Sequence, residues 1–198
     1  MTKFAQFISN LFDPMPSIVL VGLIGIFATP MSYGDRLFWL LFVGALGALV
    51  AVILLWFIRR GYVLDARLTD GKDDLHKDRL GVLWITVGLL GLTVLAAWWF
   101  GRMEPLWSIL LSMLAVLGGA SLITARYKVS IHMVGITSLV TVLLIQYGRR
   151  ALIVLVLIPL VAWSRSVLHR HTPFQLTLGT TMTALLIVTV FWLTGQLT

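Results

Sequence analysis

Long apolar stretches separated by short polar linkers make up most of this chain, and they restrict its fold more than any other feature. A membrane-spanning helix needs about 20 mostly apolar residues. The sequence predicts spans at residues 17–31, 37–58, 80–100, 106–124, 132–147, 151–163 and 176–197. The first and sixth are short, and Pro159 in the sixth favours a tilted or partly buried helix. We therefore expect an all-α, polytopic transmembrane helical bundle of six to seven spans.

The amino-acid composition agrees with a polytopic membrane protein. Hydrophobic residues make up 59% and charged residues 12%, which is roughly half the charge of a soluble domain. The 198 residues leave room for one domain, residues 1–198, and for no sizeable soluble module. The absence of cysteine excludes disulfides, thiolate metal sites and cysteine nucleophiles. The net charge of +7 suits anionic partners such as lipid headgroups, whereas no basic run on a soluble face indicates nucleic acid.

Residues 1–16 differ from the rest of the chain. They lack the charged first region and the small-residue cleavage site of a signal peptide. Their apolar residues follow helical spacing, at Phe4, Phe7, Ile8, Leu11 and Phe12. This pattern predicts a short amphipathic helix that lies on the membrane surface.

Three polar segments between the spans carry side chains suited to phosphate chemistry. The first contains Lys72 and Arg79, the second contains Ser130 and His132, and the third covers residues 164–175. Two spans separate each segment from the next, so all three should emerge on one face of the membrane. Most of the lysines and arginines also lie on this face. The positive-inside rule then predicts a multi-pass protein of the cell membrane with this face in the cytoplasm.

Cleavage of a phosphate ester through a covalent intermediate needs a nucleophile, cations that hold the phosphoryl oxygens, and an acid for the leaving group. Taken singly, each residue has an ordinary explanation: a solvated loop, an interfacial histidine, or a cation at a helix end. The spacings Lys-x6-Arg, Ser-x-His and Ser-Arg-x5-His, in this order and on one face, favour a shared site.

Together the three segments resemble the signature of the type 2 phosphatidic acid phosphatase (lipid phosphate phosphatase) superfamily. The elements of that signature read Lys-x6-Arg-Pro, Pro-Ser-Gly-His and Ser-Arg-x5-His-x3-Asp. The resemblance implies a lipid phosphatase that needs no metal and no cofactor. His171 would be the nucleophile that carries a phosphohistidine, and His132 the acid that protonates the departing alkoxide. The residues that match the phosphate-binding positions of the family are Lys72, Arg79, Ser130 and Arg165, and Ser164 and Gln175 would support the site.

The chain departs from the family pattern at four positions. Leu80 and Val129 replace prolines, and Ile131 replaces a glycine that lets the backbone approach phosphate closely. Gln175 replaces the Asp that orients the nucleophilic histidine. A change from Asp to its amide costs about 10⁴ in kcat in the serine-protease triad, partly through the wrong tautomer. The Gln175 oxygen can still accept a hydrogen bond from Nδ1 of His171.

This substitution leaves three readings open. A carboxylate of the first segment could compensate, from Asp65, Asp70, Asp73 or Asp74. Otherwise catalysis is slow, or the chain is a non-catalytic protein that binds or transports lipid phosphates. A small-solute transporter is a weaker alternative, because the spans carry few ionisable residues and no evident inverted repeat. The substrate, the bilayer and a second copy of the chain in a homo-oligomer are the partners compatible with the sequence.

Overall fold

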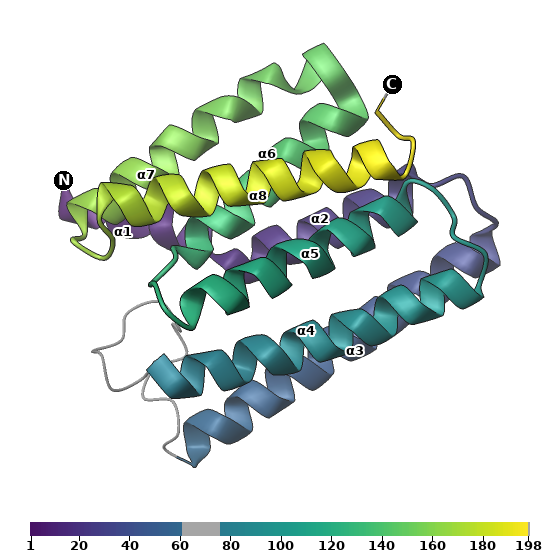
Figure 1. Ribbon diagram of the computed structural model, residues 1–198, viewed down its shortest axis with the longest axis horizontal. Coiled ribbons are helices and arrows are strands. Elements are labelled where there is room, and N and C mark those ends of the chain that lie inside the picture. Colours follow the sequence, from purple (N-terminus) through teal and green to yellow (C-terminus); the bar gives the residue numbers. More distant parts are fainter. Residues whose placement is uncertain (61–75, 198) are drawn as a thin grey trace.

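The structure is a computed structural model that describes residues 1–60 and 76–197, with the backbone alone at residues 54, 57, 58 and 76–79. The described residues form helices and no strand (Figure 1), so the predicted all-α bundle is confirmed. The α-helices are α1 (Thr2–Leu11), α2 (Pro14–Ala28), α3 (Tyr33–Arg59), α4 (His76–Trp99), α5 (Leu106–Thr124), α6 (Ile131–Tyr147), α7 (Leu157–Val167) and α8 (Pro173–Leu193). A 3-10 helix, η2 (Gly148–Val156), joins α6 to α7.

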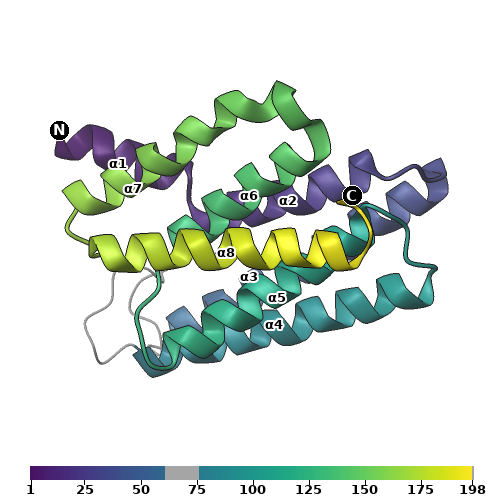
Figure 2. The same cartoon turned by 45° about the horizontal axis from the view of Figure 1, so that its top comes forward.

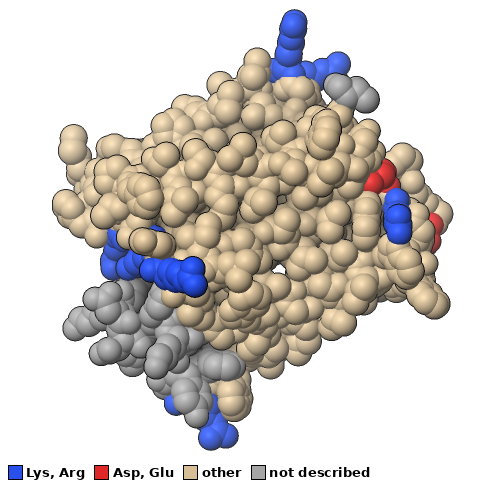
Figure 3. Space-filling view, in the orientation of Figure 1, with Lys and Arg blue, Asp and Glu red and all other residues tan. Residues whose placement is uncertain are grey.

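Six helical stretches in the described part of the chain are long and apolar enough to cross a membrane. They are Thr2–Ala28, Tyr33–Ile53, Leu80–Trp99, Leu106–Thr124, Ile131–Val167 and Pro173–Leu193. Their outer surfaces expose many large apolar side chains, among them Leu41, Leu95 and Leu185. Charged side chains gather toward the edges of the molecule and leave the broad middle of the visible face bare (Figure 3). Such a surface suits lipid rather than water, and the chain is a multi-pass membrane protein.

The path of the chain brings distant segments to the same end of the bundle. α6 runs away from the end at which it begins, and η2 and α7 return to that end (Figures 1 and 2). α6 and α8 therefore begin, and α7 ends, at what we call the site end of the bundle. α4 also begins there, and α1 lies there against α7. The N-terminus lies at the site end and the C-terminus lies at the opposite end (Figure 1).

α6 is the central helix of the bundle. Every residue from Ile131 to Val142 is buried, because α2, α7, α8 and η2 all pack against this helix. The main apolar core surrounds it and includes Ile136 and Ile187. A second apolar cluster around Trp39 joins α2, α3, α4 and α5. The polar residues at the start of α6 are therefore held in the most tightly packed part of the molecule.

Several predicted spans differ in their limits from the observed helices, and two of the differences have a clear local cause. α2 begins at Pro14, three residues before the expected start, because Asp13 caps it by accepting a hydrogen bond from the Met15 N–H (3.0 Å) and proline is favoured at the first helical position. The sixth span is a 3-10 helix as far as Val156 and an α-helix from Leu157. Pro159 falls in the first turn of α7, where a missing N–H is tolerated.

Candidate functional site

Polar residues of the second and third segments lie at the site end of the bundle (Figure 1). Ser130 precedes α6 and His132 lies in its first turn, whereas Arg165 lies in the last turn of α7 and His171 shortly precedes α8. The exposed fraction of the side chain is 0% for Ser130, 2% for His132 and for Arg165, and 7% for His171. Burying polar and charged side chains at a membrane surface costs free energy unless they are hydrogen-bonded. Such residues are therefore strong candidates for a functional site.

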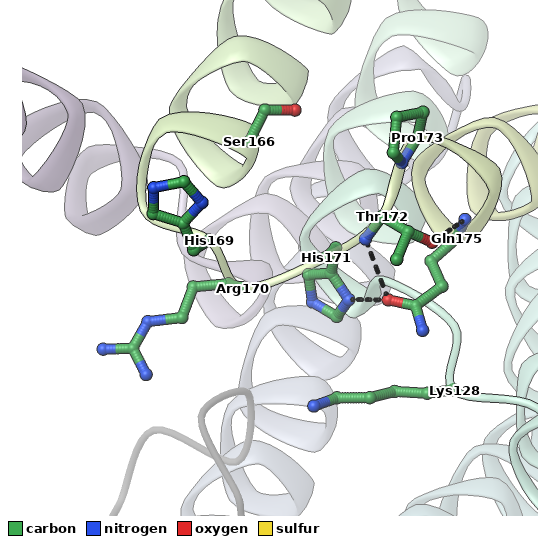
Figure 4. Close-up of a pocket in the computed structure, with 8 residues that line it drawn as sticks. All are labelled: Lys128, Ser166, His169, Arg170, His171, Thr172, Pro173 and Gln175. Carbon is green, nitrogen blue, oxygen red and sulfur yellow. Dashed lines mark hydrogen bonds between the residues drawn. The ribbon is translucent and has the colours of Figure 1, made fainter.

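His171 is held by the first turn of α8. Thr172 and Gln175 form a capping box, in which the Gln175 N–H donates to Thr172 Oγ1 (3.4 Å) and the Thr172 N–H donates to Gln175 Oε1 (3.2 Å). The same Oε1 atom lies 3.0 Å from His171 Nδ1 (Figure 4). Gln175 therefore makes the contact with His171 that the sequence suggested, and it also starts the helix.

This hydrogen-bond pattern selects one tautomer of His171. A backbone N–H can only donate, so the Thr172 N–H directs the oxygen of the Gln175 amide, and not its nitrogen, toward the histidine. An amide oxygen can only accept, so Nδ1 of a neutral His171 must carry the proton. The lone pair then resides on Nε2. An amide in place of a carboxylate can hold the histidine in the wrong tautomer. Here the helix cap orients the Gln175 amide so that His171 keeps its proton on Nδ1.

A cavity of about 560 Å³ opens beside His171. Its lining residues are Lys128, Ser166, His169, Arg170, His171, Thr172, Pro173 and Gln175 (Figure 4). Lys128 extends toward His171 from the loop between α5 and α6 (Figure 4), and with Arg170 it gives the cavity a cationic lining suited to phosphate. The family signature has no position that corresponds to Lys128. The place of Lys128 two residues before Ser130 is a signal that could have identified it.

α8 contacts the second segment directly, one turn beyond Gln175. A Cβ atom on Gly179 would lie 3.1 Å from the backbone oxygen of Ser130 and 3.3 Å from Cβ of Met133. Only a residue without a side chain allows this close approach. Since one helical turn rises about 5.4 Å, the packing at Gly179 holds the start of α8 close to Ser130.

Ser9 of α1 connects two of the predicted site residues. Arg165 Nη1 donates to Ser9 Oγ (2.8 Å), and His132 Nε2 lies 3.3 Å from both the hydroxyl and the carbonyl oxygen of Ser9. Ser164 donates to the carbonyl oxygen of Ala5, one turn earlier (2.7 Å). Sequence reasoning did not assign Ser9 to the site. Its polar side chain on the same helical face as Ala5 and Ile8 is the signal that could have found it.

The hydroxyl of Ser130 is fully buried and has no hydrogen-bond partner among the described residues. A buried hydroxyl without a partner costs free energy. Ser130 is also the residue before α6, where serine often caps the helix, yet its side chain makes no capping bond. Ser130 is not one of the residues that line the cavity beside His171, so its contact with phosphate stays a prediction.

The first segment is described only in part. Lys72 lies outside the described residues, as do the carboxylates suggested as compensating groups, Asp65, Asp70, Asp73 and Asp74. Arg79 lies in the first turn of α4, which begins at the site end (Figure 1), and its side chain is not described. Among described residues, no three histidine or acidic side chains are grouped as a metal site would require.

Comparisons with family models, with characterised proteins and with solved structures give no match to this chain.

Proposed function

We propose that this protein is a membrane phosphatase that hydrolyses a lipid phosphate or diphosphate through a phosphohistidine on His171. The observation that carries the proposal is the hydrogen bond between His171 Nδ1 and the Gln175 oxygen that the helix cap orients. It leaves the lone pair of Nε2 for nucleophilic attack, next to the cationic cavity. The resemblance of the three sequence segments to lipid phosphate phosphatases assigns the same role to His171.

In the proposed reaction, His171 Nε2 attacks phosphorus, and the bond from phosphorus to the lipid-bearing oxygen breaks. His132 gives a proton to the departing oxygen. The leaving group is a lipid alcohol when the substrate is a monophosphate, and a lipid monophosphate when it is a diphosphate. Water then attacks phosphorus and gives a proton to His132, which restores the acid. The phosphorus–nitrogen bond breaks, which releases inorganic phosphate and returns the electron pair to Nε2. Arg165 and Ser130 stabilise the charge that develops on the phosphoryl oxygens.

The position of the site suits a substrate with a membrane-bound tail. The tail would lie among the apolar helices while the phosphate occupies the cavity beside His171. Isoprenoid phosphates and diphosphates, phosphatidic acid and phosphatidylglycerophosphate all fit this description. With the site end in the cytoplasm, a substrate made inside the cell is favoured over one recycled outside it.

A non-catalytic protein that binds or transports lipid phosphates is the second candidate. The observation that favours it is the neutral amide of Gln175, which orients His171 but supplies no negative charge to stabilise an imidazolium. Such a protein would use the same cations without turnover.

Phosphate release by the purified protein from a panel of lipid phosphates separates the two candidates. For the phosphatase, His171→Asn should lower the rate by at least about a thousandfold because the nucleophile is removed. His169→Asn is the matched control, since His169 has a positive φ of 53° that asparagine also adopts, and it should lose far less activity. Labelled phosphate should remain on wild type and not on His171→Asn after an alkaline quench. Wild type that releases no phosphate would contradict the phosphatase.

A further inference from the structure

The hydroxyl of Ser9 lies between two side chains that approach it from different helices. Arg165 reaches it from the end of α7 at 2.8 Å, and His132 Nε2 approaches it from the start of α6 at 3.3 Å. Ser9 is only 3% exposed. A residue near the N-terminus is thus in hydrogen-bond range of two residues of the proposed phosphatase site, which come more than 100 positions later in the chain.

Donor and acceptor rules define what Ser9 does there. A guanidinium can only donate, so the Ser9 hydroxyl must accept the bond from Arg165. A backbone carbonyl can only accept, so the 3.3 Å contact between His132 Nε2 and the Ser9 carbonyl is a bond only when Nε2 carries a proton. The Ser9 hydroxyl thus accepts from Arg165, and the Ser9 carbonyl accepts from His132 when Nε2 carries the proton, either in the neutral Nε2–H tautomer or in the imidazolium. These contacts hold both side chains in place.

α1 is anchored firmly enough to serve as a fixed support. Ala5 and Ile8 are buried, and Ile8 belongs to the main apolar core. Ser164 donates to the Ala5 carbonyl oxygen (2.7 Å), and the Phe4 ring lies 5.9 Å from the Trp163 ring on α7. Contacts before, beside and at Ser9 thus tie α1 to α7 and to the core.

We propose that Ser9 is a positioning residue of the site and that α1 is a fourth structural element of it, beside the three segments that resemble the family signature. The inference rests on the proposed phosphatase function. Ser9 holds Arg165 in the orientation in which it binds a phosphoryl oxygen, and it fixes the position of the His132 ring for its role as the acid. The assignment extends the site to a helix that the three-segment signature does not include.

The test compares Ser9→Ala with Ser17→Ala. Ser17 is a matched control, because it is 2% exposed and its hydroxyl makes one local bond, to the Asp13 carbonyl oxygen (3.1 Å). We expect Ser9→Ala to lower kcat about tenfold with a smaller change in KM, because His132 acts only in the transition state. Ser17→Ala should keep wild-type kcat. Thermal unfolding of both variants measures the stability lost with each hydroxyl.

Two further variants separate hydrogen bonding from packing. Ser9→Thr keeps a hydroxyl and should restore kcat to within a few-fold of wild type. Ser9→Cys fills the same space with a weak acceptor and should behave like Ser9→Ala. Equal kcat in Ser9→Cys and wild type would show that the side chain only fills space, and it would overturn the proposal. A higher kcat/KM in Ser9→Ala would also overturn it, because α1 would then hold the site shut.

Binding of inorganic phosphate to the purified protein provides a readout that does not depend on turnover. If no lipid phosphate is hydrolysed by wild type, the proposed function fails, but Ser9→Ala should still weaken phosphate binding several-fold through the loss of order at Arg165. Phosphate affinity that is equal in wild type, Ser9→Ala and Ser17→Ala would then refute the positioning role by itself.

Discussion

Gln175 uses one oxygen atom for two purposes, because Oε1 accepts from the backbone of Thr172 and contacts His171. An aspartate at this position would be one methylene shorter and would have to give up one of these contacts or shift the helix start. Glutamate has the length of glutamine and is also a favoured residue at this position of a capping box. The carboxylate that best replaces Gln175 in this structure is therefore glutamate.

We predict that Gln175→Glu raises the rate of phosphate release by about tenfold or more. The carboxylate keeps both hydrogen bonds and adds a negative charge beside the imidazolium that forms when Nε2 bonds to phosphorus. Steady-state kcat for a lipid phosphate, measured beside Gln175→Leu, tests this. Gln175→Leu should lose activity because the acceptor for Nδ1 is gone.

A flat or lower rate in Gln175→Glu would contradict this prediction. It would indicate that a carboxylate of the first segment already faces His171, since two like charges near one imidazole favour protonation of one of them. Gln175→Asp, compared in the same assay, reports the cost of the shorter side chain.

Residue-level contacts could be predicted from sequence where they are local and not where they join distant segments. His171 and Gln175 are four positions apart at a helix start, so their contact follows from the spacing alone. Ser9 and Arg165 are 156 positions apart, and no local pattern relates them. Lys128 lines the cavity because of the course of the α5–α6 loop, which spacing does not define.

At the level of elements, the contact between α8 and the loop before α6 controls how closely the second and third segments approach. It depends on a glycine, since Gly179 faces the backbone of Ser130. The apolar periodicity predicted that both helices exist. It could not predict which of the many glycines lies at their contact, because a glycine inside a span has the same local signal wherever it faces. The observed limits of α2 and α7 differ from the predicted ones for a similar reason, because they depend on the local effects of Asp13 and Pro159.

We predict that Gly179→Ala lowers both stability and activity. The new Cβ would lie 3.1 Å from backbone oxygen that cannot rotate away, so α8 must shift, at a cost of about 1–3 kcal/mol. Thermal unfolding in detergent and kcat measure the two effects. Gly118→Ala is the matched control, because a Cβ there meets no atom within 4 Å. Equal stability and activity in both variants would contradict the close contact.

At the scale of the whole molecule, the two termini lie at opposite ends of the bundle (Figure 1). The site end carries the N-terminus, α1 and the cationic cavity. The sequence could not predict this arrangement by itself, because it left six or seven spans open and only an odd number puts the termini at opposite ends. The distribution of lysine and arginine predicts only which side each end faces. The turn from α6 through η2 into α7 brings the chain back to the site end (Figure 1).

We predict that a reporter fused after the last residue is extracytoplasmic, and that one fused before the first is cytoplasmic. The reason is the positive-inside rule applied to the site end. Paired reporters that are active on opposite sides of the membrane measure this directly. Both reporters on one side would mean that one short span does not cross. Exchange of the two sides would mean that the phosphate site faces outward.

The reach of Arg165 to Ser9 also has a consequence for biosynthesis. Ser9 leaves the ribosome 156 residues before Arg165. α1 is therefore made before α2 to α6 are inserted, and its partner helix, α7, is made only after them. The contact between α1 and α7 forms only after α7 has been made, so a nascent or truncated protein that ends before α7 carries α1 with its polar face unmatched. Formation of the contact between Ser9 and Arg165 thus reports that translation has passed α7.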